Sequence, residues 1–503
     1  MGKLEVISDF FDGRDIFITG GSGLIGKALI EKILYSCSGV RRIFIMMRLK
    51  SGQTIEDRLE YLKNSDVFQR IRTKSPDLLD KLEAIEGDVC EPNLANKLIA
   101  QQCLSDVSVI VHGAASVRFD DSLKKAININ ICGTKEILDF ASTLIKLKCF
   151  LHISTTYCYP EHKFMEEKLY PPSADWKDIL KVYENLDEDV LYTLEKKIIG
   201  LQPNTYTFTK NLSEHMVHEY RDKVPILIYR PSIVTPAVLE PFAGWNDNVN
   251  GPVGIMMATG CGLIRTLFTD HKVILDFNPI DVTVKAIIIT IRRQGIRTRE
   301  EIFASEVPIY NGASRDTNPV SYYELATLGK SCIPIVPFNY NVWPISFIAS
   351  TWFLQFYLRM IFLQIAPALL IDFIIKLSGR EPIVMKLQRR LYITQISLAF
   401  FMRQTFDFEN KNYMSLLNDL KEGDVDNFSF TYYKDVDHIL YFVMCILGAR
   451  RHIMKQKDDT LPLARRRFAQ MIFFRNTLRT ILYAMVVYYA FNFFKNFTAT
   501  MVT

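Results

Sequence analysis

Short apolar runs and longer amphipathic segments alternate through the first half of the chain. The runs are rich in β-branched and aromatic residues and lie at the start of 16–36 and at 41–50, 82–89, 107–115, 148–156 and 224–234. Helix-periodic segments separate several of them, notably the remainder of 16–36 and residues 122–146. Alternation of strand and helix is typical of βαβ units. The pattern therefore predicts an α/β fold with a doubly wound parallel sheet, whose ligand binds at the carboxyl ends of the strands.

The second half of the chain contains longer apolar stretches. Residues 342–358 are 17 residues without a charge, and after Arg359 a second uncharged run extends to Ile371. Seventeen residues is near the lower limit for a helix that spans a bilayer, and prolines and glutamines interrupt the stretch. We interpret residues 342–371 as a hydrophobic membrane-associated segment, with buried core as the alternative.

A further apolar stretch lies near residue 490. Fifteen uncharged residues separate Arg479 from Lys495, and the chain from Arg450 to Arg479 carries nine Lys or Arg against two Asp. Positive residues flank the cytosolic side of membrane helices, and an arginine near a helix end can extend to the interface. Residues 476–495 are therefore predicted to form a transmembrane tail anchor. The apolar residues 439–449 are too few to span a bilayer and are predicted to be a buried helix.

Composition narrows the classes of function. With 503 residues, 49% apolar and 23% charged, the chain is long enough for two or three domains and is not disordered. A net charge of +5 does not indicate nucleic acid binding. The nine cysteines are scattered without a Cys-x-x-Cys pair, so neither a metal site nor a disulfide framework is predicted. The charged N-terminus is unlike a signal peptide, and we expect the first domain to lie in the cytosol.

Three glycines mark the junction between the first strand and its helix. Gly20, Gly23 and Gly26 stand in the sequence TGGSGLIG, after an apolar strand and at the start of a periodic helix. This spacing provides a tight turn, close approach to a pyrophosphate and close packing of helix on strand. The next strand ends near Arg48, with Lys50 beyond and no acidic residue. A guanidinium at this position suits the 2′-phosphate of NADPH, with a solvated basic turn as the alternative.

Tyr206 and Lys210 begin another predicted helix, in TYTFTKNLSEH. Residues i and i+4 share a helix face, so the ammonium is expected to lower the pKa of the phenol and allow proton transfer to a carbonyl oxygen. The sequence STT at 154–156 ends a strand, and its hydroxyls, those of Thr155 and Ser154, are candidates to hold that oxygen. Asn130 is a candidate for a supporting role or for a simple helix contact.

These motifs together resemble a known class of enzyme. The set TGGSGLIG, GDV, HGAA, NICGT, STT and YTFTK is similar to the extended short-chain dehydrogenases/reductases. The narrower run RPSIVTPAVLEPFAGWNDNVNGPVG, residues 230–254, resembles the fatty acyl-CoA reductases, and the similarity extends from about residue 14 to 456. That family uses NADPH to convert long-chain acyl-CoA to a primary alcohol. Phe406 departs from the pattern, because many members have tryptophan there.

The resemblance implies a role for each candidate residue. Thr155 takes the place of the catalytic hydroxyl, with Ser154 an uncertain neighbour, and Tyr206 that of the proton donor. Lys210 would lower the pKa of Tyr206 and hold the nicotinamide ribose, and Asn130 would position Lys210. The residues implied in dinucleotide binding are Gly20, Gly23, Gly26, Arg48, Asp88, Val89, Tyr206 and Lys210.

We expect the chain to consist of four parts. They are an NADPH-binding reductase domain at 1–340 with an insertion at 160–200, the segment 342–371, a helical C-terminal domain at 366–456 and the anchor at 476–495. The insertion is predicted to be helical, with one helix ending at Gly200, and either covers the active site or is neutral. The expected partners are long-chain acyl-CoA and membrane lipid, and a homo-oligomer is left open.

The protein is expected to lie at an intracellular membrane, and two other functions are left open. The membrane is expected to be that of the endoplasmic reticulum, with peroxisome and lipid droplet as alternatives, and the reductase domain to face the cytosol. The alternatives in function are another membrane-bound short-chain enzyme, acting on a lipid, a sterol or a nucleotide sugar, and a non-catalytic NADP-binding scaffold.

Overall fold

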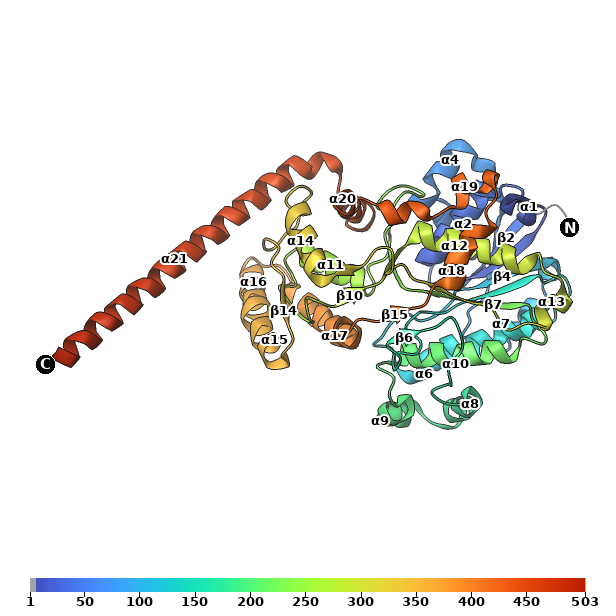
Figure 1. Cartoon of the computed structure of the whole chain (residues 1–503), viewed down its shortest axis with the longest axis horizontal. Coiled ribbons are helices and arrows are strands. Elements are labelled where there is room, and N and C mark those ends of the chain that lie inside the picture. Colours follow the sequence, from blue (N-terminus) through green and yellow to red (C-terminus); the bar gives the residue numbers. More distant parts are fainter. Residues whose placement is uncertain (1–5, 503) are drawn as a thin grey trace.

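The structure, a computed structural model, describes the backbone of residues 6–502 and the side chains of residues 6–492. It consists of a sheet domain, a helical lobe beside it, and a helix, α21 (Leu461–Val502), that projects away from both (Figure 1). The end of the predicted tail anchor, residues 493–495, lies outside the residues whose side chains are described.

Seven parallel strands form the central sheet, in the order β12-β7-β5-β4-β1-β2-β3. Their bounds are β1 Asp15–Thr19, β2 Arg42–Met47, β3 Leu82–Glu86, β4 Val107–His112, β5 Cys149–Ile153, β7 Ile226–Pro231 and β12 Ile309–Gly312. The predicted strands all lie in this sheet, and the doubly wound parallel architecture is confirmed. β12 has no predicted counterpart, because a four-residue strand gives little periodic signal.

Helices cover both faces of the sheet, which explains why the central strands are almost continuously apolar. α2 (Leu24–Ser36) and α12 (Ile280–Gly295) pack on one face. α6 (Leu123–Ile127), α7 (Gly133–Ser142) and α10 (Thr205–Glu219) pack on the other. Further helices of this domain are α1 Ile7–Phe11, α3 Ile55–Lys63, α4 Gln69–Lys74, α5 Leu94–Ile99 and α13 Arg299–Phe303.

The helical lobe is assembled from segments far apart in the chain. It contains α11 (Pro252–Gly260), α14 (Tyr322–Cys332), α15 (Phe353–Met360), α16 (Ala366–Leu377), α17 (Val384–Met402) and α20 (His438–Gly448). Short strand pairs support it: β9 (Thr266–Phe268) with β14 (Ile348–Ser350), and β10 (Ile274–Leu275) with β13 (Val320–Ser321). Another pair, β8 (Ile233–Thr235) with β11 (Phe277–Pro279), continues from the sheet towards the lobe.

The segment between α17 and α20 returns to the sheet domain. β15 (Asp407–Phe408) pairs with β6 (Phe164–Met165), and α18 (Lys411–Ser415) packs against β12. α19 (Glu422–Phe428) follows, and the buried side chains of Tyr413 and Phe430 belong to the same core as α12. The predicted unit 366–456 is therefore helical but divided between the two bodies.

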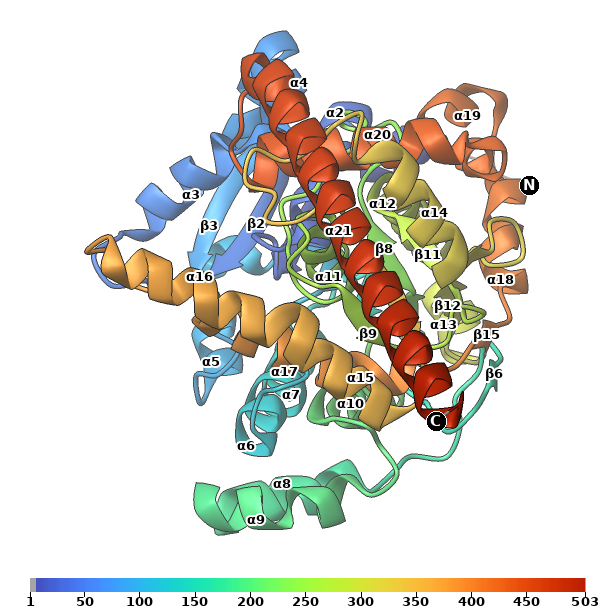
Figure 2. The same cartoon turned by 90° about the vertical axis from the view of Figure 1, so that its left-hand side faces the viewer.

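The insertion 160–200 forms two helices, α8 (Trp176–Asn185) and α9 (Glu188–Ile199). α9 ends at Gly200, as predicted, where a φ of 59° favours glycine. Both helices lie outside α6 and α10, at the edge of the sheet domain (Figure 2). α8 and α9 thus lie against the reductase fold, whereas β6, at the start of the insertion, pairs with β15 after α17.

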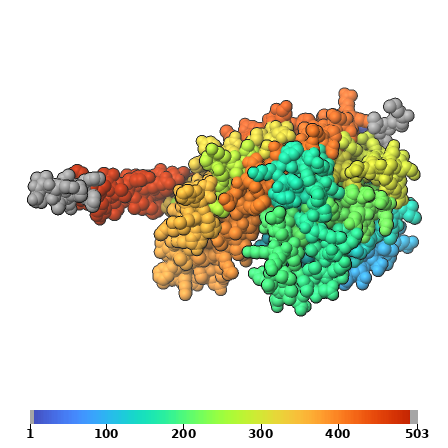
Figure 3. Space-filling view, turned by 60° about the horizontal axis from the view of Figure 1, so that its bottom comes forward, coloured from blue at the N-terminus to red at the C-terminus, as the bar shows by residue number. Residues whose placement is uncertain are grey.

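Two segments expose large apolar side chains. α15 and α16 form one continuous helix through a π turn at Ile361–Ile365, and Phe353–Leu377 is the one helix among the described residues that is long and apolar enough to cross a membrane. On α21, Ala464 and Phe468 are buried against the lobe, whereas the large apolar side chains from Phe473 to Phe491 are exposed on the part of the helix that projects from the lobe (Figure 3). The described part of the predicted anchor does not meet the same criterion, so the anchor stays a prediction.

Candidate active site

The glycine turn lies at the carboxyl end of β1. Gly20 has a φ of +75°, and a Cβ on it would lie 2.6 Å from the carbonyl carbon of Gly113 in the neighbouring strand connection. A Cβ on Gly26 would lie 2.4 Å from the Gly20 oxygen, and Gly23 caps α2. The backbone is therefore packed as a dinucleotide turn requires, with free N–H groups of α2 at the sheet edge.

The ends of β2 and β3 carry the other predicted dinucleotide residues. Arg48 is 66% exposed, and its Nη1 lies 4.0 Å from Oδ2 of Asp88. An exposed ion pair at this distance contributes little, so the guanidinium is available to a ligand. Val89 packs against Gly133 at the start of α7. A Cβ added to Gly133 would lie 2.7 Å from the Cβ of Val89. β2 and β3 follow β1 in the parallel sheet, so these residues lie at the same edge of the sheet as the glycine turn.

Tyr206 and Lys210 lie one turn apart on α10, as the sequence predicts. Asn204 caps the helix by accepting a hydrogen bond from the Thr207 N–H at 2.9 Å, which fixes where the helix begins. The Thr155 hydroxyl interacts with the Tyr206 phenol. The Lys210 ammonium donates to the carbonyl oxygen of Ile153 at 2.7 Å. The end of β5 and the start of α10 thus bring Thr155, Tyr206 and Lys210 together.

The pKa shifts of Tyr206 and Lys210 differ from what their spacing in the sequence predicts. Burial raises the pKa of Tyr206 above its ordinary value, and the hydrogen bond from Thr155 only partly opposes this. Burial lowers the pKa of Lys210 to about 8, against an opposing effect of Glu214. The expected lowering of the Tyr206 pKa by Lys210 is therefore wrong for this structure, because desolvation of the phenol outweighs other effects. At neutral pH the Tyr206 phenol is therefore protonated and the Lys210 side chain is cationic.

Asn130 holds α10 in place. It lies in a π turn, Asn128–Cys132, between α6 and α7. Its side-chain oxygen accepts from the Ser116 N–H at 2.8 Å, and its side-chain nitrogen donates to the Thr209 hydroxyl at 2.9 Å. The contact is with the neighbour of Lys210 in the sequence, so Asn130 lies where a positioning residue would.

Ser154 lies beside a different group. Its buried hydroxyl lies near the carboxylate of Glu214 but has no hydrogen-bond partner within 3.5 Å among the described residues, and Glu214 forms a fully buried ion pair with Arg230 at 2.7 Å. Burial alone would raise the pKa of Glu214, but Arg230 holds it below its ordinary value. The structure therefore groups Ser154 with a structural ion pair and Thr155 with Tyr206.

Phe119 connects the Tyr206 site to the helical lobe. Its ring stacks on Tyr206 with centroids 5.4 Å apart, and it also lies 5.7 Å from the ring of Phe401 on α17. Neither spacing nor a motif singles out Phe119 in the sequence. Its role depends on two contacts with residues more than 80 positions away in the chain.

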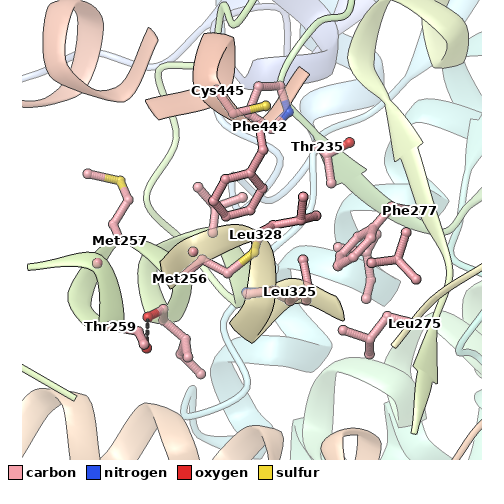
Figure 4. Close-up of a pocket in the computed structure, with 18 of the residues that line it drawn as sticks. Thr235, Met256, Met257, Thr259, Leu275, Phe277, Leu325, Leu328, Phe442 and Cys445 are labelled. Atoms are coloured by element: carbon pink, nitrogen blue, oxygen red, sulfur yellow. Dashed lines mark hydrogen bonds between the residues drawn. The ribbon is translucent and has the colours of Figure 1, made fainter. Parts of the chain in front are cut away.

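A cavity of about 200 Å³ opens within the lobe (Figure 4). Its walls come from α11, α14, α20 and the strands β10 and β11, and are formed mainly by apolar side chains such as Met256, Leu325, Leu328, Phe277 and Phe442. Phe401 also lines it, as does Tyr157, two residues after Thr155. The apolar cavity and the hydroxyl pair are thus neighbours. No residue of the insertion 160–200 lines this cavity.

No group of three or more His, Cys, Asp or Glu side chains among the described residues is arranged to hold a metal ion.

Two family models described as male sterility protein match the chain, an NAD-binding one at residues 18–287 and a second at 363–456. Fatty acyl-CoA reductase 1 of Gallus gallus is 30% identical over 486 residues, covering 95% of this chain and 92% of the relative. The Mus musculus protein of the same name is 31% identical with the same coverage. The chain belongs to the fatty acyl-CoA reductase family.

As a member of the fatty acyl-CoA reductase family, the protein is an oxidoreductase with an NAD(P)-binding domain. The crystal structure of the terminal R domain from the myxalamid PKS-NRPS biosynthetic pathway has the same fold, with a TM-score of 0.55. The two sequences are 16% identical, and the structural match covers 87% of this chain and 91% of the R domain.

The run 230–254, which carries the family resemblance, joins the two bodies of the reductase. A Cβ on Gly244 would lie 2.0 Å from the Met444 oxygen, and one on Gly448 would lie 1.7 Å from the Gly244 oxygen. α20 can approach the sheet domain this closely only because both positions are glycine. Trp245 is buried beside this contact in the chain, and Asn246 lines the cavity.

Proposed function

We propose that the protein reduces long-chain fatty acyl-CoA to a primary fatty alcohol with NADPH, releasing CoA and passing through an aldehyde. The observation that carries the proposal is the position of the Thr155–Tyr206 hydroxyl pair beside an apolar cavity. The cavity, about 200 Å³ in volume and lined mainly by apolar side chains, supports a binding site for an acyl chain. Its few polar walls suit an alkyl chain better than a sugar nucleotide.

The residues of the dinucleotide turn fit NADPH. Gly20, Gly23 and Gly26 leave no side chain where the pyrophosphate would lie, and the N-terminus of α2 faces it. The exposed guanidinium of Arg48 is available for the 2′-phosphate, and no acidic residue follows β2 directly. When bound, NADPH supplies a hydride to the substrate carbonyl carbon.

Thr155 and Tyr206 act on the carbonyl oxygen. As negative charge develops there, both hydroxyls donate hydrogen bonds to it, which lowers the barrier most where water is excluded. The raised pKa of Tyr206 keeps the phenol protonated until the oxygen becomes a stronger base and takes its proton. The Lys210 ammonium lies one helical turn from Tyr206 and donates to the carbonyl oxygen of Ile153 at the end of β5.

The reaction balances in two rounds. In the first, a hydride adds to the thioester carbon, the carbon–sulfur bond breaks, and the sulfur leaves with a proton as CoA. In the second, another hydride and a proton convert the aldehyde to the alcohol. The apolar cavity retains the acyl chain between the rounds, because each buried CH₂ contributes about 0.8 kcal/mol.

The protein is proposed to work at a membrane. The apolar helix Phe353–Leu377 and the exposed apolar side chains of α21 support this. The reductase domain would face the cytosol, where its substrates are soluble, and the membrane would be that of the endoplasmic reticulum. Organelle fractionation of the tagged chain distinguishes this location from peroxisomes and lipid droplets.

The test is product identification. Membranes containing the protein are incubated with acyl-CoA of increasing chain length and with NADPH or NADH in parallel, and alcohol, aldehyde and free CoA are measured. We expect alcohol from long-chain acyl-CoA, with higher kcat/KM for NADPH than for NADH. Turnover of a sterol or a nucleotide sugar, and of no acyl-CoA, would exclude the proposal.

Tyr206→Phe tests the proton donor. We expect alcohol formation to fall about 10²–10⁴-fold, because the Thr155 hydroxyl remains but no proton donor does. Tyr192→Phe is the matched control, since Tyr192 is 75% exposed on α9. This variant should form alcohol at the parental rate. A parental rate in Tyr206→Phe would show that another group donates the proton.

A further inference from the structure

A second cavity, of about 380 Å³, lies at the base of α21. Its walls are the end of α14 and the loop after it, the segment before β14, and one side of α21. Ile345 and Phe347 line both this cavity and the apolar cavity described above. The reductase chemistry proposed above uses no residue that is unique to this second cavity.

Positive charge is concentrated in the second cavity. Lys330, Arg475 and Arg479 line it, and Arg265 donates to Ser346, another lining residue, at 3.3 Å. Within the described part of the chain, none of these four cations has a carboxylate oxygen within 4.0 Å. Burial lowers the pKa of Arg265, and Arg479 and Arg475 lower it further by repulsion. The cavity therefore holds like charges that nothing in the described chain neutralises.

A phosphate group would relieve this repulsion. Arginine presents a planar fork of N–H donors that matches the oxygens of a phosphate, and charge-assisted bonds of this kind are about twice as strong as neutral ones. Arg475 is half-buried on α21 and Arg479 is exposed one turn further along. Both can therefore contact an anion that enters from solvent or from a membrane surface.

The position of the cavity favours a membrane lipid as the source of the phosphate. Arg475 and Arg479 stand at the beginning of the predicted anchor 476–495, the level at which headgroups surround a membrane helix. α15 and α16 lie on the side of the lobe from which α21 projects (Figure 1), and expose Phe362, Phe373 and Leu377. The cationic cavity thus lies between two apolar surfaces, as a headgroup lies between protein and acyl chains.

We propose that this cavity binds the phosphate of an anionic phospholipid headgroup and orients the reductase on its membrane. The bound lipid would fix the angle at which α21 leaves the lobe, since Arg475 and Arg479 are on α21 and Lys330 is on α14. It would also keep α15 and α16 against the membrane surface.

The test measures thermal stabilisation of the full-length chain in non-ionic detergent. Short-chain phosphatidic acid is titrated, with short-chain phosphatidylcholine, inorganic phosphate and free CoA as parallel probes. We expect phosphatidic acid to raise Tm by a few degrees. The three parallel probes should raise Tm only at much higher concentration. Arg475→Gln/Arg479→Gln should weaken the apparent affinity for phosphatidic acid about tenfold or more.

Arg466→Gln/Arg467→Gln is the matched control, because it removes two exposed charges from the same helix outside the cavity. Lys330→Gln is a second cavity variant that leaves α21 unchanged, in case the double variant folds poorly. Equal loss in the cavity and control variants would show non-specific attraction and overturn the proposal. A shift produced as readily by CoA or by inorganic phosphate would overturn the lipid assignment, and so would no shift in the unmodified protein.

Discussion

Tyr206 and Lys210 have a spacing that is visible in the sequence, but their protonation depends on what surrounds them. Lys210 is only 3% exposed and hydrogen bonds to a backbone carbonyl in place of a carboxylate. A buried ammonium loses its proton more readily than one in water. Its pKa of about 8 lies close enough to neutrality for the enzyme to respond to pH.

The alkaline side of the rate profile tests Lys210. Because its pKa is lowered to about 8, the ammonium is present below this pH and is lost as the pH rises through it. We expect kcat/KM to fall with increasing pH around 8. Lys210→Arg keeps its charge at higher pH, so its profile should lose this fall even if the maximum rate is lower. An identical alkaline limb in both proteins would assign the ionisation to another group.

At the scale of the elements, local signals account for what the sequence could predict. A few neighbouring residues are enough to identify a strand that is apolar along its length. The same is true of the glycine turn after β1. Thr155, Tyr206 and Lys210 lie at the ends of such elements, so they could also be found. Gly200 could be identified as the end of α9 for the same reason.

The elements that the sequence did not place depend on distant contacts. The cavity walls come from segments that begin near residue 157 and end near 453, and no local pattern relates them. The return of α18 and α19 to the sheet domain rests on packing of Tyr413 and Phe430 with residues of α12. The pKa of Tyr206 likewise reflects burial by its surroundings and not its spacing from Lys210.

Narrowing the cavity should change the preferred substrate. Ala326 on α14 lines the cavity, whereas its neighbour Thr327 is exposed and does not. Ala326→Leu should shorten the longest acyl chain that is accepted, since excluding two CH₂ groups costs about 1.6 kcal/mol, or about 15-fold in kcat/KM. The measurement compares kcat/KM across acyl-CoA lengths, with Thr327→Leu as the control. An unchanged ratio of long to short substrates in Ala326→Leu would place the acyl chain elsewhere.

At the scale of the whole molecule, the active site and the exposed apolar surfaces lie on different parts. The glycine turn and the hydroxyl pair belong to the sheet domain, and the cavity lies in the lobe. The apolar side chains of α15, α16 and α21 face outward beyond the lobe. Contiguous exposed apolar surface of this kind marks contact with a membrane or a partner. The arrangement allows the lobe to lie at a bilayer while the sheet domain stays in water.

Removal of the two apolar surfaces, singly and together, tests membrane insertion. Truncation after Arg475 retains the buried contacts of Ala464 and Phe468 but deletes the predicted anchor. Leu370→Gln, Phe373→Gln and Leu377→Gln change only side chains of α16 that are 59–72% exposed, so the fold of the lobe should persist. After extraction of membranes with alkaline carbonate, we expect the full chain in the pellet, each single change to weaken retention, and the combination to release the protein. Apolar burial of about 25 cal/mol per Å² makes either surface a substantial contribution to binding. Recovery of the unmodified chain in the carbonate supernatant would instead mean that neither surface inserts, and that α21 and α16 are covered by another protein.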